Sequence, residues 1–260
     1  MDGPIFGLCS VLTLLGTAIV VSRYLMQRGR GNDEYRVARR AHIVALLSAF
    51  IGSLLAVPPV AAIADGATTP ELSCLVSDIS AVIFCASLQV MIIDWEYREL
   101  PHDVGIGCRI ALVFVVSGLL IWQFHRTDPA RFHLALSTSY AQFDDVRIYL
   151  LTYLSFFAAA AAEVAMRATK LARAVWRQGR PAGAGLAVAA GGATLGVLYA
   201  ASRGGYVLAY ESGHAWPLAL DNVISPALAG LSIGGVAAGL SMAVLSNSRR
   251  PSTQRRNVNA

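Results

Sequence analysis

Seven long apolar segments dominate this 260-residue sequence and restrict the kind of fold it can form. A helix needs about 20 apolar residues to cross the hydrocarbon layer of a bilayer, and each segment approaches that length. Charged residues make up only 14% of the chain, against roughly a quarter in soluble domains. The sequence therefore predicts an all-α polytopic membrane protein, a bundle of seven transmembrane helices whose main partner is the lipid bilayer. The segments run over Pro4–Val21, Ile43–Ala64, Leu72–Ile93, Val104–Phe124, Ile148–Met166, Gly183–Tyr206 and Ile224–Leu245.

Positively charged residues beside these segments predict the orientation of the bundle. The chain has 20 Arg and a single Lys, and 17 of these 21 residues lie in or beside the first, third and fifth connections and the C-terminal tail. By the positive-inside rule these regions are cytoplasmic, so the N-terminus is expected outside and the C-terminus inside. No Lys or Arg precedes the first segment, which is the reverse of a secretory signal peptide. Arg109 lies near the start of the fourth segment and is expected to extend to the membrane interface.

The organisation of the chain is expected to be simple. Residues 1–246 form one transmembrane domain, and residues 247–260 form a disordered, basic cytoplasmic tail. The longest external connection, near His125–Arg147, has room for a short interfacial helix. The net charge of +5 comes from clusters next to apolar segments, which orient helices and contact anionic headgroups, so no nucleic-acid partner is predicted. The bias toward Arg and Ala is typical of high-GC bacteria, in which the cell membrane would hold this protein.

Small residues and prolines predict how the helices pack. Glycines four residues apart let helix backbones approach closely in lipid. The pair Pro58–Pro59 removes two backbone donors late in the second segment and is expected to kink or end that helix. Gly183 and Gly185 follow no predicted strand, so packing is the expected role of these residues and not dinucleotide binding. The four-residue spacings are Gly192–Gly196, Gly230–Gly234 and Gly235–Gly239.

Ionisable residues inside the apolar segments are the candidates for function, because charge in a membrane is costly. Asp78 lies about two turns into the third segment from the outside, and Arg203 lies at a similar depth in the sixth. Glu163 lies in the inner part of the fifth segment, one turn before Arg167. We expect Asp78 and Arg203 to share a polar cavity, and we assign substrate binding to these two residues with Tyr199 and Glu163. The structural alternatives are a local Glu163–Arg167 pair and an Arg203 that only extends to the interface.

Sequence motifs for cofactor chemistry are missing. The seventh segment has no Lys for a retinal Schiff base, the chain has no Walker A motif, and Asp144–Asp145 lacks the third acidic residue of a magnesium-diphosphate site. Glu211, His214 and Asp221 lie close together in the last external connection and could bind a metal ion or a proton. One His with scattered carboxylates is a weak pattern, and the four cysteines form no CxxC pair. We therefore predict no cofactor and no metal site.

Two longer stretches carry a family resemblance. VARRAHIVALLSAFIGSLLAVPPVAAIAD is followed by TTPELS and LQVMIIDW, and GLAVAAGGATLGVLYAASRGGYVLA is followed by HAWPLALDNVISPALAGL. From about Arg30 to Leu245 the chain resembles the actinobacterial seven-helix membrane proteins that are described as transporters. The resemblance implies transport of a small molecule or an ion. Members of that family usually continue into a cytoplasmic C-terminal region, whereas this sequence stops soon after its last apolar segment. The residues that carry the resemblance are Pro58, Pro59, Trp95, Tyr199, Arg203, Trp216 and Pro226.

A membrane-embedded terpene cyclase is the alternative prediction. Such an enzyme protonates an epoxide or alkene of a lipophilic prenyl substrate, so it needs a neutral carboxylic acid in a dry cavity with aromatic walls. Asp78 or Glu163 could be the catalytic acid, with Tyr199, Trp95 or Phe84 as the walls. The arrangement of a Trp-Glu pair with an Asp-Gly pair known from fungal cyclases is not matched, because the Trp-Glu pair here lies at a helix end. A scaffold or signalling protein, the third prediction, would need no buried charges. We favour transport, and the sequence specifies neither the substrate nor the oligomeric state.

Overall fold

The computed structural model describes residues 2–27, 36–96, 101–129, 135–179 and 181–247. Over these ranges the chain forms eight α-helices and one short 3-10 helix, without any strand. Seven of the helices, all except α3, are long and apolar enough to cross a membrane, which confirms the predicted all-α polytopic bundle. The predicted tail lies almost wholly outside the described residues. The elements are α1 (Asp2–Gln27), α2 (Arg36–Leu55), α3 (Pro58–Ala67), α4 (Leu72–Glu96), α5 (Pro101–Thr127), η2 (Thr138–Tyr140), α7 (Asp144–Arg177), α8 (Ala182–Glu211) and α9 (Leu218–Asn247).

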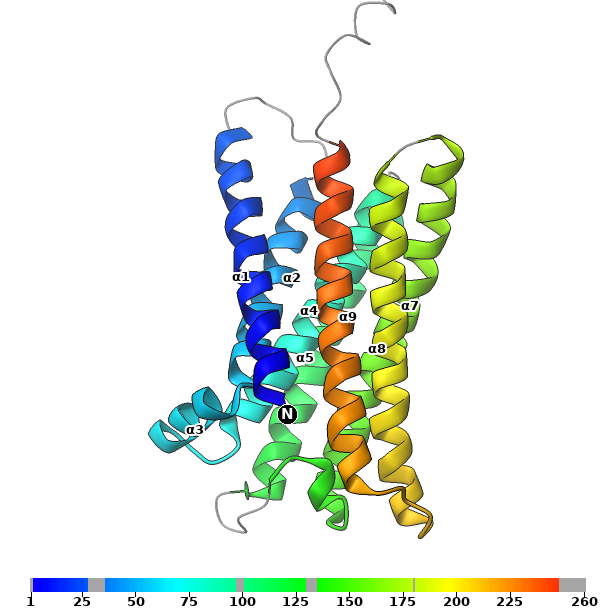
Figure 1. Cartoon of the computed structure of the whole chain (residues 1–260). Helices are drawn as coiled ribbons and strands as arrows, with labels where there is room; N and C mark the ends of the chain where they lie inside the picture. The colour runs from blue at the N-terminus through cyan, green and yellow to red at the C-terminus, as the bar shows by residue number, and fades with distance from the viewer. Residues whose placement is uncertain (1, 28–35, 97–100, 130–134, 180, 248–260) are drawn as a thin grey trace, which may run out of the picture.

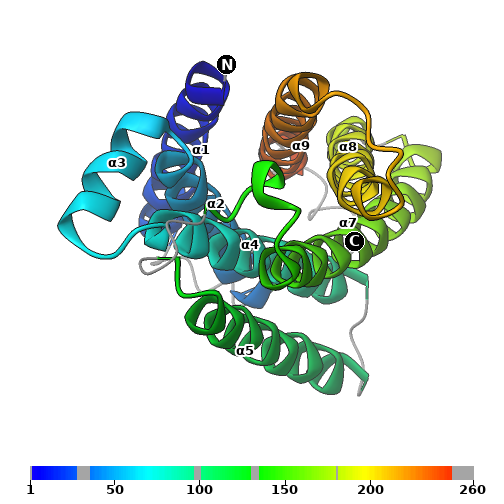
Figure 2. The same cartoon turned by 90° about the horizontal axis from the view of Figure 1, so that it is seen from below.

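Helix α4 occupies the centre of the bundle. It packs against α2, α5 and α7, while α8 packs between α7 and α9, and α1 contacts α2 and α9 (Figures 1 and 2). Val82 and Met91 of α4 are fully buried. Helices α1 and α5 lie at the periphery and leave large apolar side chains on the surface, including Leu8 at 62% and Phe114 at 74% exposure. An apolar outer surface over a packed interior is the arrangement that lipid solvent favours.

The second crossing differs from the prediction. The predicted bounds Ile43–Ala64 are wrong, because α2 covers Arg36–Leu55 and Pro58 starts the separate helix α3. Proline fits the first turn of a helix, where its missing N–H would have no partner, and it cannot continue the preceding helix. The expected end of the helix before the two prolines is thus confirmed. Helix α3 projects from the side of the bundle and buries none of its residues, with Ile63 74% exposed (Figures 1 and 2).

Close backbone packing joins α8 to α9, as the glycine spacings predict. A Cβ atom on Gly192 would lie 2.6 Å from the backbone nitrogen of Val236, and one on Gly235 would lie 3.0 Å from the Cα of Gly192. A Cβ atom on Gly185 would also meet the α9 backbone, at 2.6 Å. The two helices can therefore touch only because these positions carry no side chain. Gly234 does not take part, since its missing Cβ would point into open space.

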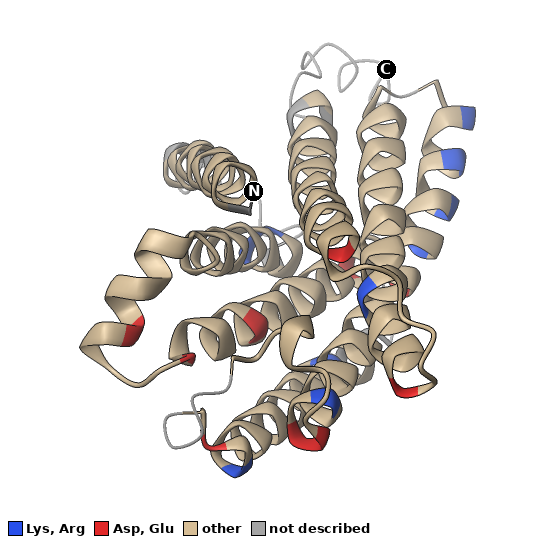
Figure 3. Ribbon diagram, turned by 60° about the horizontal axis from the view of Figure 1, so that its bottom comes forward, with Lys and Arg blue, Asp and Glu red and all other residues tan. Residues whose placement is uncertain are grey.

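Helix α7 extends well beyond the predicted segment Ile148–Met166. Its 34 residues give a length of about 51 Å, against about 30 Å for the hydrocarbon layer. The extension at its C-terminal end carries Lys170, Arg173 and Arg177 and lies at the same end of the bundle as the N-terminus of α8 and the C-terminus of α9 (Figures 1 and 3). Positive charge therefore gathers at the end that the sequence assigns to the cytoplasm.

Candidate functional site

Polar side chains from four helices meet in the predicted outer half of the bundle. We call this set the outer cluster. Three of the four residues assigned to substrate binding, Asp78, Tyr199 and Arg203, belong to it. Its members are Asp78 of α4, Tyr149 and Tyr153 of α7, Tyr199 and Arg203 of α8, and Asp221 of α9.

Asp78 has a direct hydrogen-bond partner that the sequence prediction missed. The hydroxyl group of Tyr149 donates a hydrogen bond of 2.8 Å to Oδ2 of Asp78. The thiol of Cys74, one turn earlier on α4, lies 3.9 Å from the same oxygen. The Tyr149 side chain is fully buried. A partly buried carboxyl group is stabilised by such donors, which replace hydrogen bonds to water.

Arg203 supplies the positive charge of the outer cluster. It is close enough to interact electrostatically with both Asp78 and Asp221, and with the Tyr199 hydroxyl one turn away on α8. No direct hydrogen bond joins Arg203 to Asp78 in the described part of the chain, so the expected pair interacts through space. The structure thus brings Asp78 and Arg203 into one polar environment, with Tyr149 as the direct partner of the carboxyl group.

Aromatic side chains form the inner boundary of the outer cluster. Tyr199 is buried and packs edge-to-face on Phe157, with 5.5 Å between the ring centroids, and Phe157 in turn packs against the ring of Tyr153 at 6.0 Å. Gly196, one turn before Tyr199, makes room for Phe157, because a Cβ atom there would lie 3.3 Å from the Phe157 ring. Trp95 is too far from Asp78 to form a wall beside it, since it lies 17 residues beyond Asp78, about 25 Å further along α4. Phe84 lies six residues beyond Asp78, so it faces a different side of α4.

Asp221 belongs to the outer cluster and not to a loop site. It lies in the first turn of α9 with 1% exposure, and its two oxygens accept hydrogen bonds from Thr138 at 3.1 Å and from Ser225 at 2.8 Å. His214 is exposed, with its ring nitrogen Nδ1 2.7 Å from the backbone oxygen of Ser212. The suggested group of Glu211, His214 and Asp221 is therefore not assembled. Across the residues that the structure describes, no three His, Cys, Asp or Glu side chains converge on a metal position.

The connection between α5 and α7 covers the outer end of the cluster. Residues 135–141 lie across the centre of that end of the bundle (Figure 2). The backbone N–H of Leu136 donates a hydrogen bond of 3.1 Å to Oε2 of Glu71, and the thiol of Cys74 lies 3.6 Å from the Leu136 carbonyl oxygen. Burial raises the pKa of Glu71, the hydrogen bond from Leu136 opposes this shift, and the charge of Asp65 adds to it.

The backbone at Glu71 is itself held by these contacts. Its φ angle of 65° is uncommon for a residue other than glycine. Two residues later, Ser73 donates hydrogen bonds from its N–H and its hydroxyl group to the carboxylate of Asp65, at 2.8 and 2.9 Å. The end of α3, the start of α4 and the connection over the cluster are therefore joined by carboxylate hydrogen bonds.

Glu163 belongs to a second polar group, nearer the predicted cytoplasmic side, which we call the inner cluster. It consists of Gln89, Arg109, Glu163 and Arg167. Oε1 of Glu163 accepts hydrogen bonds from Arg109 at 2.6 Å and from Arg167 at 2.9 Å, and its Oε2 accepts one from Gln89 at 2.6 Å. Arg109, which the sequence places near the membrane interface, pairs with Glu163. The local Glu163–Arg167 pair exists, but as one part of a network across α4, α5 and α7.

An apolar layer separates the two clusters. Tyr149 and Glu163 are 14 residues apart on α7, which corresponds to about 21 Å along the helix. Between these depths α4 contributes Val82 and Cys85 and α7 contributes Phe157, all of them buried in the same core. The structure thus divides the four assigned residues, with Glu163 below this layer and the other three above it.

Sequence reasoning missed Gln89, Tyr149 and Tyr153 because it started from the charged residues inside the apolar segments. A signal was present, since Gln89 follows Asp78 by three turns and interrupts a continuous apolar run. The pocket that the structure describes lies elsewhere, between α7 and α8, and borders none of the four assigned residues. Comparisons of the chain with protein-family models, with curated proteins and with solved structures found no match.

Proposed function

We propose that this protein is a cell-membrane transporter that moves a proton or a small cationic solute along a polar path through the helix bundle. The observation that carries the proposal is the composition of the outer cluster, which combines two carboxyl groups, Asp78 and Asp221, with one guanidinium group, Arg203. The resemblance to actinobacterial seven-helix transporters points to the same class of function, and we extend that family assignment to this chain as part of the proposal.

Charge balance favours a positively charged substrate. Ionised carboxyl groups in a low-dielectric interior are stabilised by positive charges nearby. With Asp78 and Asp221 both ionised, Arg203 neutralises one of them and leaves one negative charge in the cluster. A proton on Asp78 or a bound cation would supply the missing charge. An anionic solute would add to the imbalance and is disfavoured.

The layered arrangement of polar and apolar groups supports a gated path. A transporter must expose its binding groups to one side of the membrane at a time. The outer cluster lies beneath the connection of residues 135–141, and the layer around Phe157 separates it from Glu163 and the inner cluster. In the proposed mechanism, movement of α8 and α9 past α7 withdraws Phe157 from between the clusters. The side-chain-free contact around Gly192 and Gly235 lets α8 and α9 move as one unit.

One specific observation favours terpene cyclisation as the second candidate. Asp78 lies beside Tyr149 and close to Tyr153 and Tyr199, so an acid capable of protonating an alkene or epoxide would have aromatic groups next to the resulting carbocation. A cyclase also requires an enclosed space for a prenyl chain beside the acid. We rank this function second, because the resemblance to transporters points to the other class of function.

Transport is tested with purified protein in liposomes that contain a pH-sensitive dye. Wild-type protein should acidify or alkalise the interior when a proton or cation gradient is imposed, because Asp78 provides a site for the moving charge. Asp78→Asn should abolish the signal, and Tyr149→Phe, which removes only one hydrogen bond to Asp78, should weaken it. Asp144→Asn is the matched control, since it changes a carboxyl group that is 77% exposed and pairs with Arg147, which is not a member of the cluster.

Two outcomes would overturn the proposal. Equal flux in wild-type and Asp78→Asn protein would show that the outer cluster does not carry the transported charge. The same liposomes incubated with epoxidised and plain prenyl compounds should yield no new product by mass spectrometry. A cyclised product that disappears in Asp78→Asn would replace transport with the cyclase function.

A further inference from the structure

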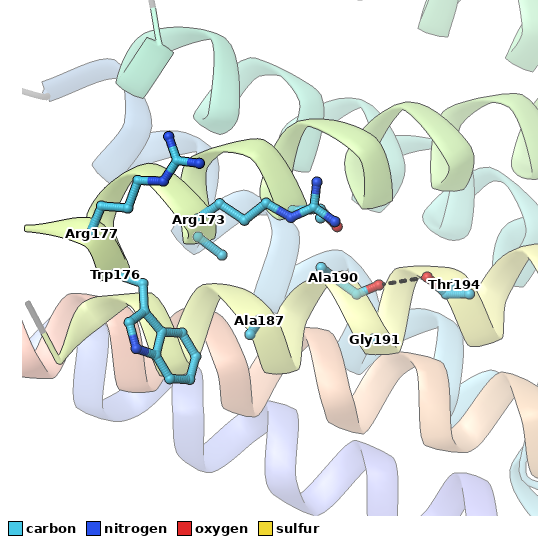
Figure 4. Close-up of a pocket in the computed structure, with 9 residues that line it drawn as sticks. Arg173, Trp176, Arg177, Ala187, Ala190, Gly191 and Thr194 are labelled. Carbon is cyan, nitrogen blue, oxygen red and sulfur yellow. Dashed lines mark hydrogen bonds between the residues drawn. The ribbon is translucent and has the colours of Figure 1, made fainter.

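A groove opens on the side of the bundle, between the predicted cytoplasmic part of α7 and the adjacent part of α8. Its volume is about 540 Å³, within the range of about 300–1,000 Å³ that small-molecule sites occupy. Arg173, Trp176 and Arg177 of α7 border it on one side, and Ala187 and Gly191 of α8 form much of its floor (Figure 4). None of these residues belongs to the outer or the inner cluster.

The small residues of α8 create this groove. Gly183 lets α8 approach α7 at its first turn, where a Cβ atom would lie 3.2 Å from the backbone nitrogen of Trp176. Further along α8, Ala187 and Gly191 are exposed and carry too little bulk to fill the surface between the two helices. A Cβ atom on Gly191 would have no neighbour within 4 Å. The floor is therefore apolar, shallow and open to the membrane.

The two arginines at the groove are available to bind an anion. Arg173 and Arg177 lie one turn apart, are exposed and extend in the same direction from α7 (Figure 4). Neither has an acidic partner among the described residues, in contrast to Arg109 and Arg167, which both pair with Glu163. Guanidinium groups one turn apart can bind the oxygens of one phosphate together.

Trp176 fixes the depth of the groove relative to the membrane. Its side chain is 61% exposed, and tryptophan is enriched where hydrocarbon meets the headgroups. The arginines lie within one turn of Trp176, whereas Ala187 and Gly191 continue toward the middle of the bilayer. Positive charge at headgroup level and an apolar floor below it match the two ends of a phospholipid.

We propose that this groove binds one anionic glycerophospholipid of the cytoplasmic leaflet. Arg173 and Arg177 bind its phosphate group, Trp176 packs beside its glycerol backbone, and one acyl chain lies along Ala187 and Gly191. A free phosphate ion would leave the apolar floor without a partner, so the lipid is the occupant that uses both parts of the groove. This site is independent of the transport activity proposed above.

The test uses the fluorescence of Trp176 in proteoliposomes. Trp95, Trp122 and Trp216 are replaced by Phe, and the protein is reconstituted into phosphatidylcholine with increasing fractions of phosphatidylglycerol that carries brominated chains, which quench nearby tryptophan. Quenching should be half-complete at a lower fraction of brominated phosphatidylglycerol than of brominated phosphatidylcholine. Arg173→Gln and Arg177→Gln should each weaken this preference about five-fold. Arg40→Gln is the matched control, because it removes one exposed positive charge at the same end of the bundle.

A second variant tests the groove without altering its charge or any tryptophan. Gly191→Leu should fill the floor and reduce the phosphatidylglycerol that remains bound to the otherwise wild-type protein in native mass spectrometry. Gly118→Leu is its control, since Gly118 is an exposed glycine of α5 with equally open surroundings. Equal quenching by both lipids, an equal effect of Arg40→Gln, or unchanged binding in Gly191→Leu would overturn the proposal. Displacement of the lipid by millimolar inorganic phosphate would show that the site binds a free anion.

Discussion

Gly192→Ala should destabilise the protein by disrupting the contact between α8 and α9. The added methyl group would lie 2.6 Å from the backbone nitrogen of Val236, 2.9 Å from the carbonyl carbon of Gly235 and 3.0 Å from the backbone oxygen of Ser232. An ordinary contact requires 3.4–4 Å. All three atoms belong to the backbone of α9, so no side-chain rotation can relieve the overlap, and α9 must move away by about 1 Å.

The expected cost follows from the balance of two effects. Overpacking of a close contact costs about 1–3 kcal/mol, and movement of α9 would also loosen its contact with Gly185. Replacing glycine by alanine in a helix returns about 1 kcal/mol of helix propensity. The neighbouring variant Gly191→Ala obtains the same gain without any overlap, because Gly191 has open surroundings. The difference between the two variants therefore isolates the packing cost, about 1–3 kcal/mol.

Thermal unfolding of the purified proteins in one detergent measures this difference. Gly191→Ala should unfold at or above the wild-type temperature, and Gly192→Ala should unfold several degrees below it. Circular dichroism before heating checks that both variants keep the wild-type helix content. Equal unfolding temperatures for the two variants would refute the claim that the helix backbones meet at Gly192.

Two further predictions concern the outer end of the bundle. Burial raises the pKa of Glu71, so the protonated side chain favours the folded state at low pH. This stabilisation is lost as pH rises through the raised pKa and the buried carboxyl group ionises. Glu71→Gln should therefore raise the unfolding temperature at pH 7.5 and leave it unchanged near pH 4. The Gln side chain can still accept the hydrogen bond from Leu136. Glu211→Gln serves as the exposed control. An effect of Glu71→Gln of the same size at both pH values would contradict the claim that ionisation of Glu71 causes it. For orientation, a reporter fused after Arg180 should signal cytoplasm and one fused after Thr69 should signal the exterior. A cytoplasmic signal at Thr69 would reverse the topology.

Several features of the fold could be predicted because each depends on a short stretch of sequence. Lipid requires every crossing to be long and apolar, independently of its neighbours, so six of the seven segments lie within helices of the bundle as predicted. The second segment was misplaced because hydropathy does not distinguish the apolar residues of α2 from those of α3. Pro58 and Pro59 were the better indicator, since their effect on the backbone is local and steric.

The position of a charge along a helix could also be predicted, whereas its partner could not. Counting turns from the predicted outer surface places Asp78 and Arg203 at similar depths, close enough for their charges to interact. The same counting cannot show which way a helix is rotated about its axis. For this reason the sequence did not reveal that Tyr149 faces Asp78 or that Arg109 faces Glu163.

Length, hydropathy and the distribution of positive charge thus determined that this chain forms a seven-helix membrane bundle. They also identified Asp78, Glu163 and Arg203 as charged residues whose place inside the membrane costs free energy. Only the tertiary structure decided that these residues belong to two clusters separated by the layer around Phe157. The physical reason is that helix rotation and neighbour choice are set by side-chain packing between helices, such as the contact at Gly192. Such contacts join residues far apart in the sequence, and no local pattern encodes them.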